Sequence, residues 1–186
     1  MTPTNTLVNE RIILDLCGGT GAWSAPYSAA GYDVRNITLP DDIRLTCVPE
    51  RAYGILAAPP CTHLSGSGAR WWEAKGEKAL LEALSISDAC LRFVALCNPV
   101  FWALENPVGR LVRYYRKPKM YFHPYEYGDP WTKRTCLWGN FMMLAYRPVR
   151  HEEKSRIWYM SPGPERSKMR SITPAGFAKA FFEANQ

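Results

Sequence analysis

An apolar run containing β-branched residues, Arg-Ile-Ile-Leu-Asp-Leu-Cys at positions 11–17, stops at the turn sequence Gly18-Gly19-Thr20-Gly21. Such a run predicts a buried strand, and the glycines predict a tight turn after it. Residues 23–30 then have the pattern of a helix that ends at Gly31. Glycines let a ligand approach the backbone closely, and a helix start offers free N–H donors. The order strand, glycine turn, helix therefore predicts an α/β sheet with a ligand loop, although a turn without a ligand is the alternative.

The alternation of strands and helices continues as far as residue 110. The predicted elements are strands at 32–37, 54–57 and 100–104 and a helix over 78–97. The helix has a wide apolar stripe, and Asn98-Pro99 ends it because the residue before a proline avoids the helical region. Strands separated by helices predict an α/β fold with a parallel sheet and helices on both faces.

The pattern is weaker after residue 110. We predict a strand over 135–138 followed by a turn at Gly139-Asn140, and a surface loop over 148–168. A last helix starts at Thr173-Pro174, with the proline at its first helical position. No composition shift marks a linker, so we expect a single domain over residues 1–186, with residues 1–10 flexible.

Positive charge is concentrated in the second half of the chain. The net charge is +6, and basic residues alternate with tyrosines from Arg110 to Tyr121 and continue to Arg170. A basic region with aromatic residues over 110–170 suits a polyanion with stackable bases, whereas a solvated basic face is the ordinary alternative. The sequence has no run of eighteen apolar residues and no signal segment, so we expect a cytoplasmic protein without a membrane partner.

One cysteine differs from the others in its surroundings. The six cysteines stand at positions 17, 47, 61, 90, 97 and 136, without a Cys-x-x-Cys pair or histidines at zinc spacing. This predicts reduced, mostly buried thiols and no metal site. Cys61, however, ends the sequence Ala58-Pro59-Pro60-Cys61, which follows an apolar strand. Ligands bind beyond the carboxyl ends of parallel strands, so a thiol held there by two rigid prolines indicates a nucleophile.

An acidic side chain follows another predicted strand. Glu105, in Glu105-Asn106-Pro107, comes directly after the buried strand 100–104. At that edge its carboxyl group is placed to hold a proton for a reacting group. A nucleophile and an acid at the ends of two strands of one sheet predict a reaction centre, although each alone is a weak signal.

These motifs resemble the marks of the DNA (cytosine-5) methyltransferase family. Asp15 to Gly21 resembles the family's cofactor loop, Pro59-Pro60-Cys61 its nucleophile motif, and Glu105-Asn106-Pro107 its Glu-Asn-Val acid motif. The resemblance covers residues 11–140 and extends to short methylases of phage genomes. It implies a Rossmann-like class I S-adenosylmethionine-dependent methyltransferase sheet and methyl transfer to C5 of cytosine in duplex DNA. Cys61 would add to C6 of a cytosine flipped out of the helix.

The resemblance also implies roles for other residues. Glu105 would hydrogen-bond the N3 edge of the cytosine, and Arg134 would contact the base or its phosphate. The implied substrate contacts are Pro60, Ser65, Asn106 and Lys133, with residues 65–70 as a lid.

The implied cofactor is S-adenosylmethionine. Its site would consist of Asp15, Cys17, Gly18, Gly19, Thr20, Gly21, Asn36, Asp42 and Pro59. Asp15 would orient the loop or reach the methionine amino group, and Asp42 would meet the adenine amino group. The second strand lacks the family's acid for the ribose hydroxyls, so Asn36 and Asp33 are alternative ribose contacts.

Several residues depart from the family pattern. Thr62 and Thr132 stand where glutamine is usual, and Pro107 stands where valine is usual. The stretch from Arg134 to Arg170 is too short for a large target-recognition domain, whose surface base readout in the major groove needs. We therefore expect a short or loose target context, unless a partner protein or a second copy of the chain supplies recognition.

Three alternatives stay open. The same chemistry on RNA or on a free cytosine nucleotide needs no recognition domain. A non-catalytic module that binds cofactor or nucleic acid is disfavoured by the presence of both Cys61 and Glu105. Methylation of amino groups is also disfavoured, because those enzymes generally have an aromatic residue where Cys61 stands.

Overall fold

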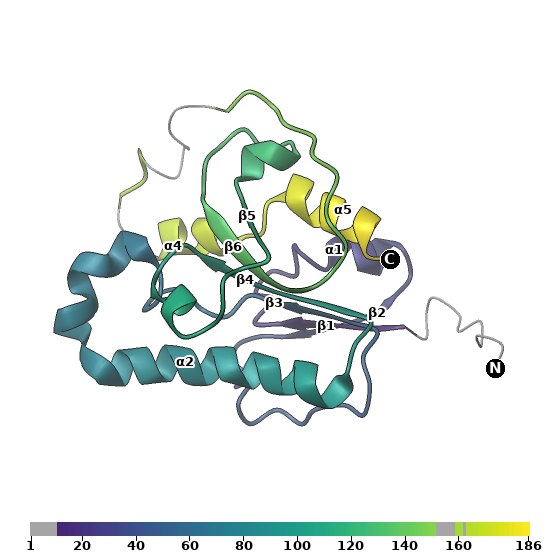
Figure 1. Ribbon diagram of the computed structural model, residues 1–186, viewed down its shortest axis with the longest axis horizontal. Coiled ribbons are helices and arrows are strands. Elements are labelled where there is room, and N and C mark those ends of the chain that lie inside the picture. Colours follow the sequence, from purple (N-terminus) through teal and green to yellow (C-terminus); the bar gives the residue numbers. More distant parts are fainter. Residues whose placement is uncertain (1–10, 152–158, 162) are drawn as a thin grey trace.

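The computed structural model describes residues 11–151, 159–161 and 163–186, so the predicted flexible segment 1–10 lies outside the described residues. It contains a six-stranded sheet in the order β2-β1-β3-β4-β6-β5, with helices on both faces (Figure 1). The strands are β1 (Ile12–Leu16), β2 (Asp33–Ile37), β3 (Gly54–Ala57), β4 (Phe101–Pro107), β5 (Met120–Phe122) and β6 (Thr135–Asn140). The helices are α1 (Ala25–Ala29), α2 (Trp72–Cys97), α4 (Pro164–Ser171) and α5 (Ala175–Ala184), with 3-10 turns η2 (Gly66–Trp71), η3 (Arg110–Arg113) and η4 (Pro124–Tyr127).

The predicted parallel sheet is confirmed for β1 to β4 but not for the last two strands. β6 lies between β4 and β5 and is antiparallel to both. The predicted turn at Gly139-Asn140 is wrong, because both residues pair with β4. A Cβ atom on Gly139 would lie 2.1 Å from the Trp102 carbonyl oxygen, so glycine permits this pairing. The same ladder keeps Glu105-Asn106-Pro107 inside β4 rather than after it.

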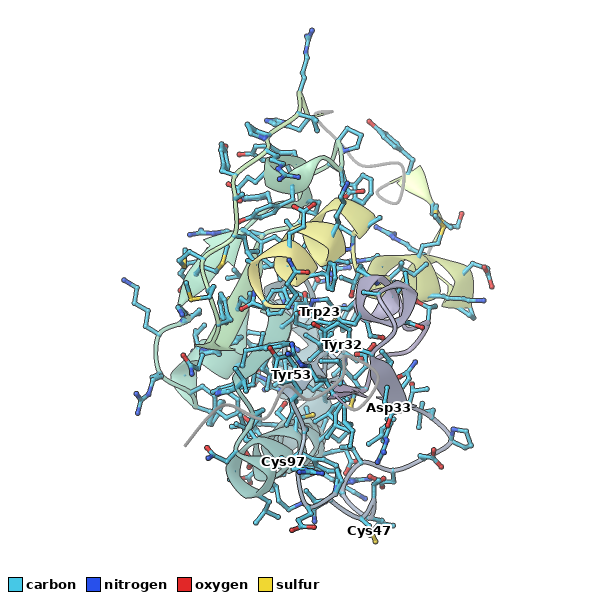
Figure 2. The ribbon with its side chains drawn as sticks, turned by 90° about the vertical axis from the view of Figure 1, so that its right-hand side faces the viewer. Trp23, Tyr32, Asp33, Cys47, Tyr53 and Cys97 are labelled. Carbon is cyan, nitrogen blue, oxygen red and sulfur yellow. The ribbon has the colours of Figure 1, made fainter. Side chains whose placement is uncertain are left out.

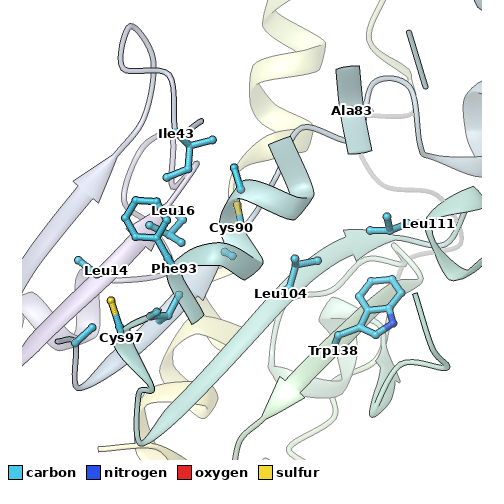
Figure 3. Close-up of a cluster of buried hydrophobic side chains, with 14 of the residues drawn as sticks. Leu14, Leu16, Ile43, Ala83, Cys90, Phe93, Cys97, Leu104, Leu111 and Trp138 are labelled. Atoms are coloured by element: carbon cyan, nitrogen blue, oxygen red, sulfur yellow. The ribbon is translucent and has the colours of Figure 1, made fainter. Parts of the chain in front are cut away.

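Two hydrophobic clusters cover the two faces of the sheet. On one face Trp23 and Tyr27 pack with Phe177 and Phe181 of α5. Figure 2 shows Trp23 and Tyr32 on the side of α5 and Cys97 on the side of α2. The other cluster joins the sheet to α2 through Leu14, Leu16, Leu104, Cys90, Phe93 and Cys97 (Figure 3). Burial of each large apolar side chain contributes about 1.5–3 kcal/mol, so this two-sided core fixes the sheet that carries the site.

The helices differ from the sequence prediction mainly at their ends. α2 begins at Trp72 rather than at residue 78, with a break at Gly76, where φ is 70°. Asn98 ends it in the left-handed conformation, which confirms the predicted end. α5 starts one residue after Pro174, which is its N-cap.

Two further predictions were wrong. Residues 164–168, predicted as loop, belong to α4, while residues 152–158 and 162 of that predicted loop lie outside the described residues. Cys47 is exposed rather than buried.

Within the part of the chain that the structure describes, no helix has the length and apolar character needed to cross a membrane.

The sheet has one topological switch point. β1 lies between β2 and β3, and all three run in parallel, so the chain leaves β1 toward one side and returns on the other. In open α/β sheets ligands bind in the crevice beyond the carboxyl ends of the strands at such a point. In Figure 1, α4 and the start of α2 lie at the end of the sheet toward which β1 runs.

Candidate functional site

The glycine loop after β1 is pressed onto the sheet on its inner side and is open on its outer side. Cys17 and Gly19 both have positive φ, of 57° and 55°. A Cβ atom on Gly18 would lie 2.3 Å from Cγ of Asp15, so only glycine allows the loop to approach this carboxyl group. At Gly19 a Cβ atom would meet nothing within 4 Å. The loop therefore presents exposed backbone at the switch point, which is what a close-lying ligand requires.

Asp15 supports this loop from below. Its side chain is fully buried, and Ser24 Oγ donates a hydrogen bond of 2.6 Å to Oδ2. Oδ1 has no hydrogen-bond partner among the described residues. Burial raises the pKa of Asp15 to about 6, and the hydrogen bond from Ser24 opposes the rise. Of the two roles open for Asp15, its position beneath Gly18 favours orientation of the loop.

The raised pKa of Asp15 predicts an inverse dependence of stability on pH. Between about pH 4 and pH 6 the native state binds more protons than the unfolded state, so stability falls as pH rises. The cost of ionising Asp15 is on the order of 3 kcal/mol when complete. The free energy of unfolding by urea should be measured for wild type and for Asp15→Asn at several pH values from about 4 to about 6 and above. The difference between the two proteins should change by this amount over that pH range. Asp33→Asn, which changes an exposed carboxylate, is the control, and parallel curves for wild type and Asp15→Asn would refute the prediction.

Two polar residues predicted for the cofactor lie beside the loop. Asn36 pairs with Asp15 in the sheet, and its Nδ2 donates a hydrogen bond of 3.2 Å to the Gly19 carbonyl oxygen. Asp33 is at the opposite end of β2 and is paired with Arg35 at 2.8 Å, so of the two ribose candidates Asn36 is the one at the loop. Asp42 also follows β2, but its carboxylate is held by Arg44 at 2.6 Å, which lowers the pKa of Asp42 to about 2. A ligand amino group would have to share that carboxylate with Arg44.

These features fit S-adenosylmethionine. The open glycine backbone admits a ligand that lies against it, and the unpartnered Oδ1 of Asp15 marks a polar position beneath the loop. The amide of Asn36 stands at the strand end, where a ribose hydroxyl group can accept or donate a hydrogen bond. The loop and Asn36 therefore offer the backbone access and the polar group that this cofactor would need.

The segment that carries Cys61 is held rigidly at the neighbouring strand end. Pro59 is buried, and its carbonyl oxygen accepts a hydrogen bond of 2.9 Å from Asn106 Nδ2. The Cys61 carbonyl oxygen accepts from the backbone N–H groups of Leu64 and Ser65, both at 2.9 Å. Asn106 is itself fully buried, so its amide nitrogen positions the Pro-Pro-Cys segment and is not open to a substrate. Pro60 is exposed beside the thiol.

Charged groups surround the half-buried thiol of Cys61. Burial raises the pKa of the Cys61 thiol, and the carboxylate of Glu105 raises it further, while Lys133 and Arg170 lower it. Lys133 Nζ lies 3.6 Å from Oε1 of Glu105. The structure thus brings together the predicted nucleophile, the predicted acid and a lysine. Because the thiol is protonated at neutral pH, its reactivity depends on the balance of these neighbouring charges.

Lys133, rather than Arg134, contacts Glu105. Successive side chains of an extended segment point to opposite sides, and these two residues directly precede β6. The guanidinium of Arg134 is 5.0 Å from the centre of the Tyr121 ring and is exposed. The family resemblance implied a contact with the base for Arg134. Lys133 is nearer to Glu105 than Arg134 is, so it is better placed for that contact.

The predicted lid is tied to the loop after β4. Ser65 forms an antiparallel bridge with Gly109, and a Cβ atom on Gly109 would lie 2.0 Å from the Leu64 carbonyl oxygen. Arg110 is buried, donates from Nε to the His63 carbonyl oxygen at 2.7 Å, and lies over the Trp72 ring. Ser65 is buried, with its hydroxyl 3.0 Å from that of Ser67. Residues 65–70 are thus a short anchored turn in this structure.

The sequence placed Arg110 and Arg170 in the basic region 110–170 but predicted no individual role at the site for either. Arg110 gives no local signal, because its contacts, His63 and Trp72, are far away in the sequence. Arg170 lies in the last turn of α4, whose ends carry ordinary helix signals: Pro164 and Glu165 in the first turn, and Lys168 and Arg170 in the last. Those signals could have identified the helix, but they could not have shown that its last turn lies near Cys61 and Lys133.

Comparison with known proteins supports the fold. No family model matches the chain, and no curated protein matches it. It is similar to the solved structure of an E. coli prophage-encoded protein described as a DNA modification methyltransferase, with a TM-score of 0.54 and 17% sequence identity. The match covers 82% of this chain and 55% of that chain, so this chain is similar to little more than half of the neighbour. The predicted α/β Rossmann-like fold is confirmed.

Proposed function

We propose that this chain transfers a methyl group from S-adenosylmethionine to C5 of cytosine in DNA through a transient bond between Cys61 and C6. The observation that carries the proposal is the meeting of a half-buried thiol, Glu105 and Lys133 beside the open glycine loop. The fold similarity to the E. coli protein described as a DNA modification methyltransferase supports the coarser part of this proposal, methyl transfer to DNA. We propose a single domain with a short target context.

The glycine loop and Asn36 would hold the cofactor, with Asp15 supporting the loop. When bound, S-adenosylmethionine supplies an electrophilic methyl group. The carboxyl edge of the sheet places this loop next to the Pro-Pro-Cys segment, because β1 and β3 are adjacent strands. A cytosine turned out of the duplex would then lie between the loop and Glu105.

The side chains divide the chemistry between them. Cys61 Sγ loses its proton to solvent and adds to C6, and the electron pair of the C5–C6 double bond moves toward C5. Glu105, held by Lys133, hydrogen-bonds the N3 edge, where charge changes most as the bond forms. C5 would take the methyl group from the cofactor, whose bond from sulfur to that carbon breaks, so that S-adenosylhomocysteine leaves. A base then removes the C5 proton and the bond between C6 and the Cys61 sulfur breaks, which restores the double bond and the thiolate.

Two assays on the wild-type protein test this proposal. Tritiated S-adenosylmethionine should label cytosine-containing duplex DNA, and duplex DNA with 5-fluorocytosine should form a covalent adduct, because fluorine at C5 blocks proton removal. Mass spectrometry should place the adduct on the peptide that contains Cys61. Labelling of RNA or deoxycytidine monophosphate instead of duplex DNA would move the same chemistry to that substrate. Cofactor binding without either labelling or adduct would refute the proposal.

A further inference from the structure

Arg170 presents a guanidinium without a carboxylate partner next to the proposed reaction centre. Some arginines of the described chain are paired with a carboxylate, such as Arg35 with Asp33 at 2.8 Å and Arg147 with Glu183 at 3.0 Å. Among the described residues, no carboxylate lies within 4.0 Å of the Arg170 guanidinium. Its side-chain contact is a hydrogen bond of 3.4 Å from Nη2 to the hydroxyl of Ser67. That distance is long for an N–H···O bond, so this guanidinium is available to a stronger acceptor.

Backbone and charge connect Arg170 to the proposed catalytic residues. The Arg170 carbonyl oxygen accepts a hydrogen bond of 3.2 Å from Lys133 Nζ, the same group that contacts Glu105. The positive charge of Arg170 also lowers the pKa of the Cys61 thiol, which places the guanidinium within electrostatic range of the sulfur. The last turn of α4 is therefore joined to the site, although Cys61 is more than a hundred residues away in the sequence.

The chemistry of this group is that of an oxyanion site. A guanidinium presents paired N–H donors that match a phosphate, and a serine hydroxyl adds one more donor. The hydroxyls of Ser65 and Ser67 lie 3.0 Å apart on the segment that follows Cys61. A phosphate that displaced the long contact between Arg170 and Ser67 would be held by α4 on one side and by the Cys61 segment on the other.

We propose that Arg170, together with Ser67, binds the phosphodiester that adjoins the target cytosine; this inference rests on the proposed function. A nucleotide turned out of a duplex must be held by its backbone if the base is to meet the thiol in register. Contact with the adjoining phosphate supplies this register without reading sequence. Arg170 is thus a positioning residue.

A binding cycle tests the contact independently of methyl transfer. Fluorescence anisotropy would compare a short duplex that has one unpaired cytosine with the same duplex carrying a neutral methylphosphonate next to that cytosine. Loss of the phosphate charge should weaken binding to wild type about ten-fold, the scale of one charge-assisted contact. Arg170→Ala should weaken binding to the native duplex by a similar factor and should bind both duplexes equally. Its salt slope should fall by about one unit.

Matched variants separate this contact from general charge effects. Arg35→Ala, which removes an arginine paired with Asp33, should keep the full methylphosphonate penalty. Arg170→Lys should recover only part of the affinity, because lysine lacks the paired donors. An equal penalty in wild type and Arg170→Ala, or no binding of either duplex by wild type, would overturn the inference. A completed cycle without methyl transfer or adduct would instead refute the chemistry at Cys61 and leave the phosphate contact standing.

Discussion

Cys61→Ala is expected to reduce methyl transfer to DNA by at least about 10³-fold while leaving cofactor affinity unchanged. Removal of the sulfur removes the bond to C6, and without that bond C5 of cytosine is too weak a nucleophile. The thiol belongs to the segment after β3, whereas the glycine loop follows β1, so the loop keeps its geometry. Transfer of tritium from S-adenosylmethionine measures the first effect, and isothermal titration with the cofactor measures the second.

The control is Cys47→Ala, which removes an exposed cysteine outside the site. This variant should retain full methyl transfer and should still form the adduct with 5-fluorocytosine. Cys61→Ala should form none. If Cys61→Ala retained activity within a factor of ten, the role of this sulfur as the nucleophile would have to be abandoned.

The sheet edge was predictable because its signals are local. The apolar run before Gly18 and the proline pair before Cys61 each indicate a strand end without reference to the rest of the chain. Parallel pairing then brings these ends together, since β1 and β3 are neighbours. The sequence explained the glycines by a tight turn and the close approach of a ligand, whereas the structure shows that Gly18 is required by the carboxyl group of Asp15 directly beneath it.

The second half of the sheet could not be derived in this way. Gly139-Asn140 has the composition of a turn, yet both residues are strand because β4 supplies partners from more than thirty residues away. Lys133 and Arg134 are both basic, and their roles depend on which of them points to the same side of the sheet as Glu105. In an extended segment a shift of one residue exchanges the two faces, so a motif match alone cannot decide between neighbours.

The charged groups around Cys61 have opposite effects on the pKa of its thiol. Glu105 disfavours the thiolate, while Lys133 and Arg170 favour it, and burial disfavours it most. A carboxylate that hinders formation of the nucleophile is an unexpected neighbour unless it is needed for a later step. Under the proposed function that step is the hydrogen bond to the N3 edge of the ring, which requires Glu105 once the thiolate has added. Thiol reactivity and methyl transfer should therefore respond to Glu105 in opposite directions.

Glu105→Gln is expected to speed alkylation of Cys61 by iodoacetamide and to slow methyl transfer by about 10²–10³-fold. Loss of the negative charge lowers the pKa of Cys61, so more thiolate is present at a given mildly alkaline pH. The amide still fits beside Lys133 but stabilises the N3 edge poorly. Mass spectrometry of the Cys61 peptide in a Cys47→Ser background follows alkylation without interference from the exposed thiol.

The matched control is Glu73→Gln, at an exposed position in the first turn of α2, which should change neither rate. If Glu105→Gln slowed both alkylation and methyl transfer, the carboxylate would be supporting the thiolate rather than opposing it. If it slowed neither, Glu105 would be only the ion-pair partner of Lys133. Only the combination of faster alkylation and slower methyl transfer fits a carboxylate that acts on the ring after the sulfur has added.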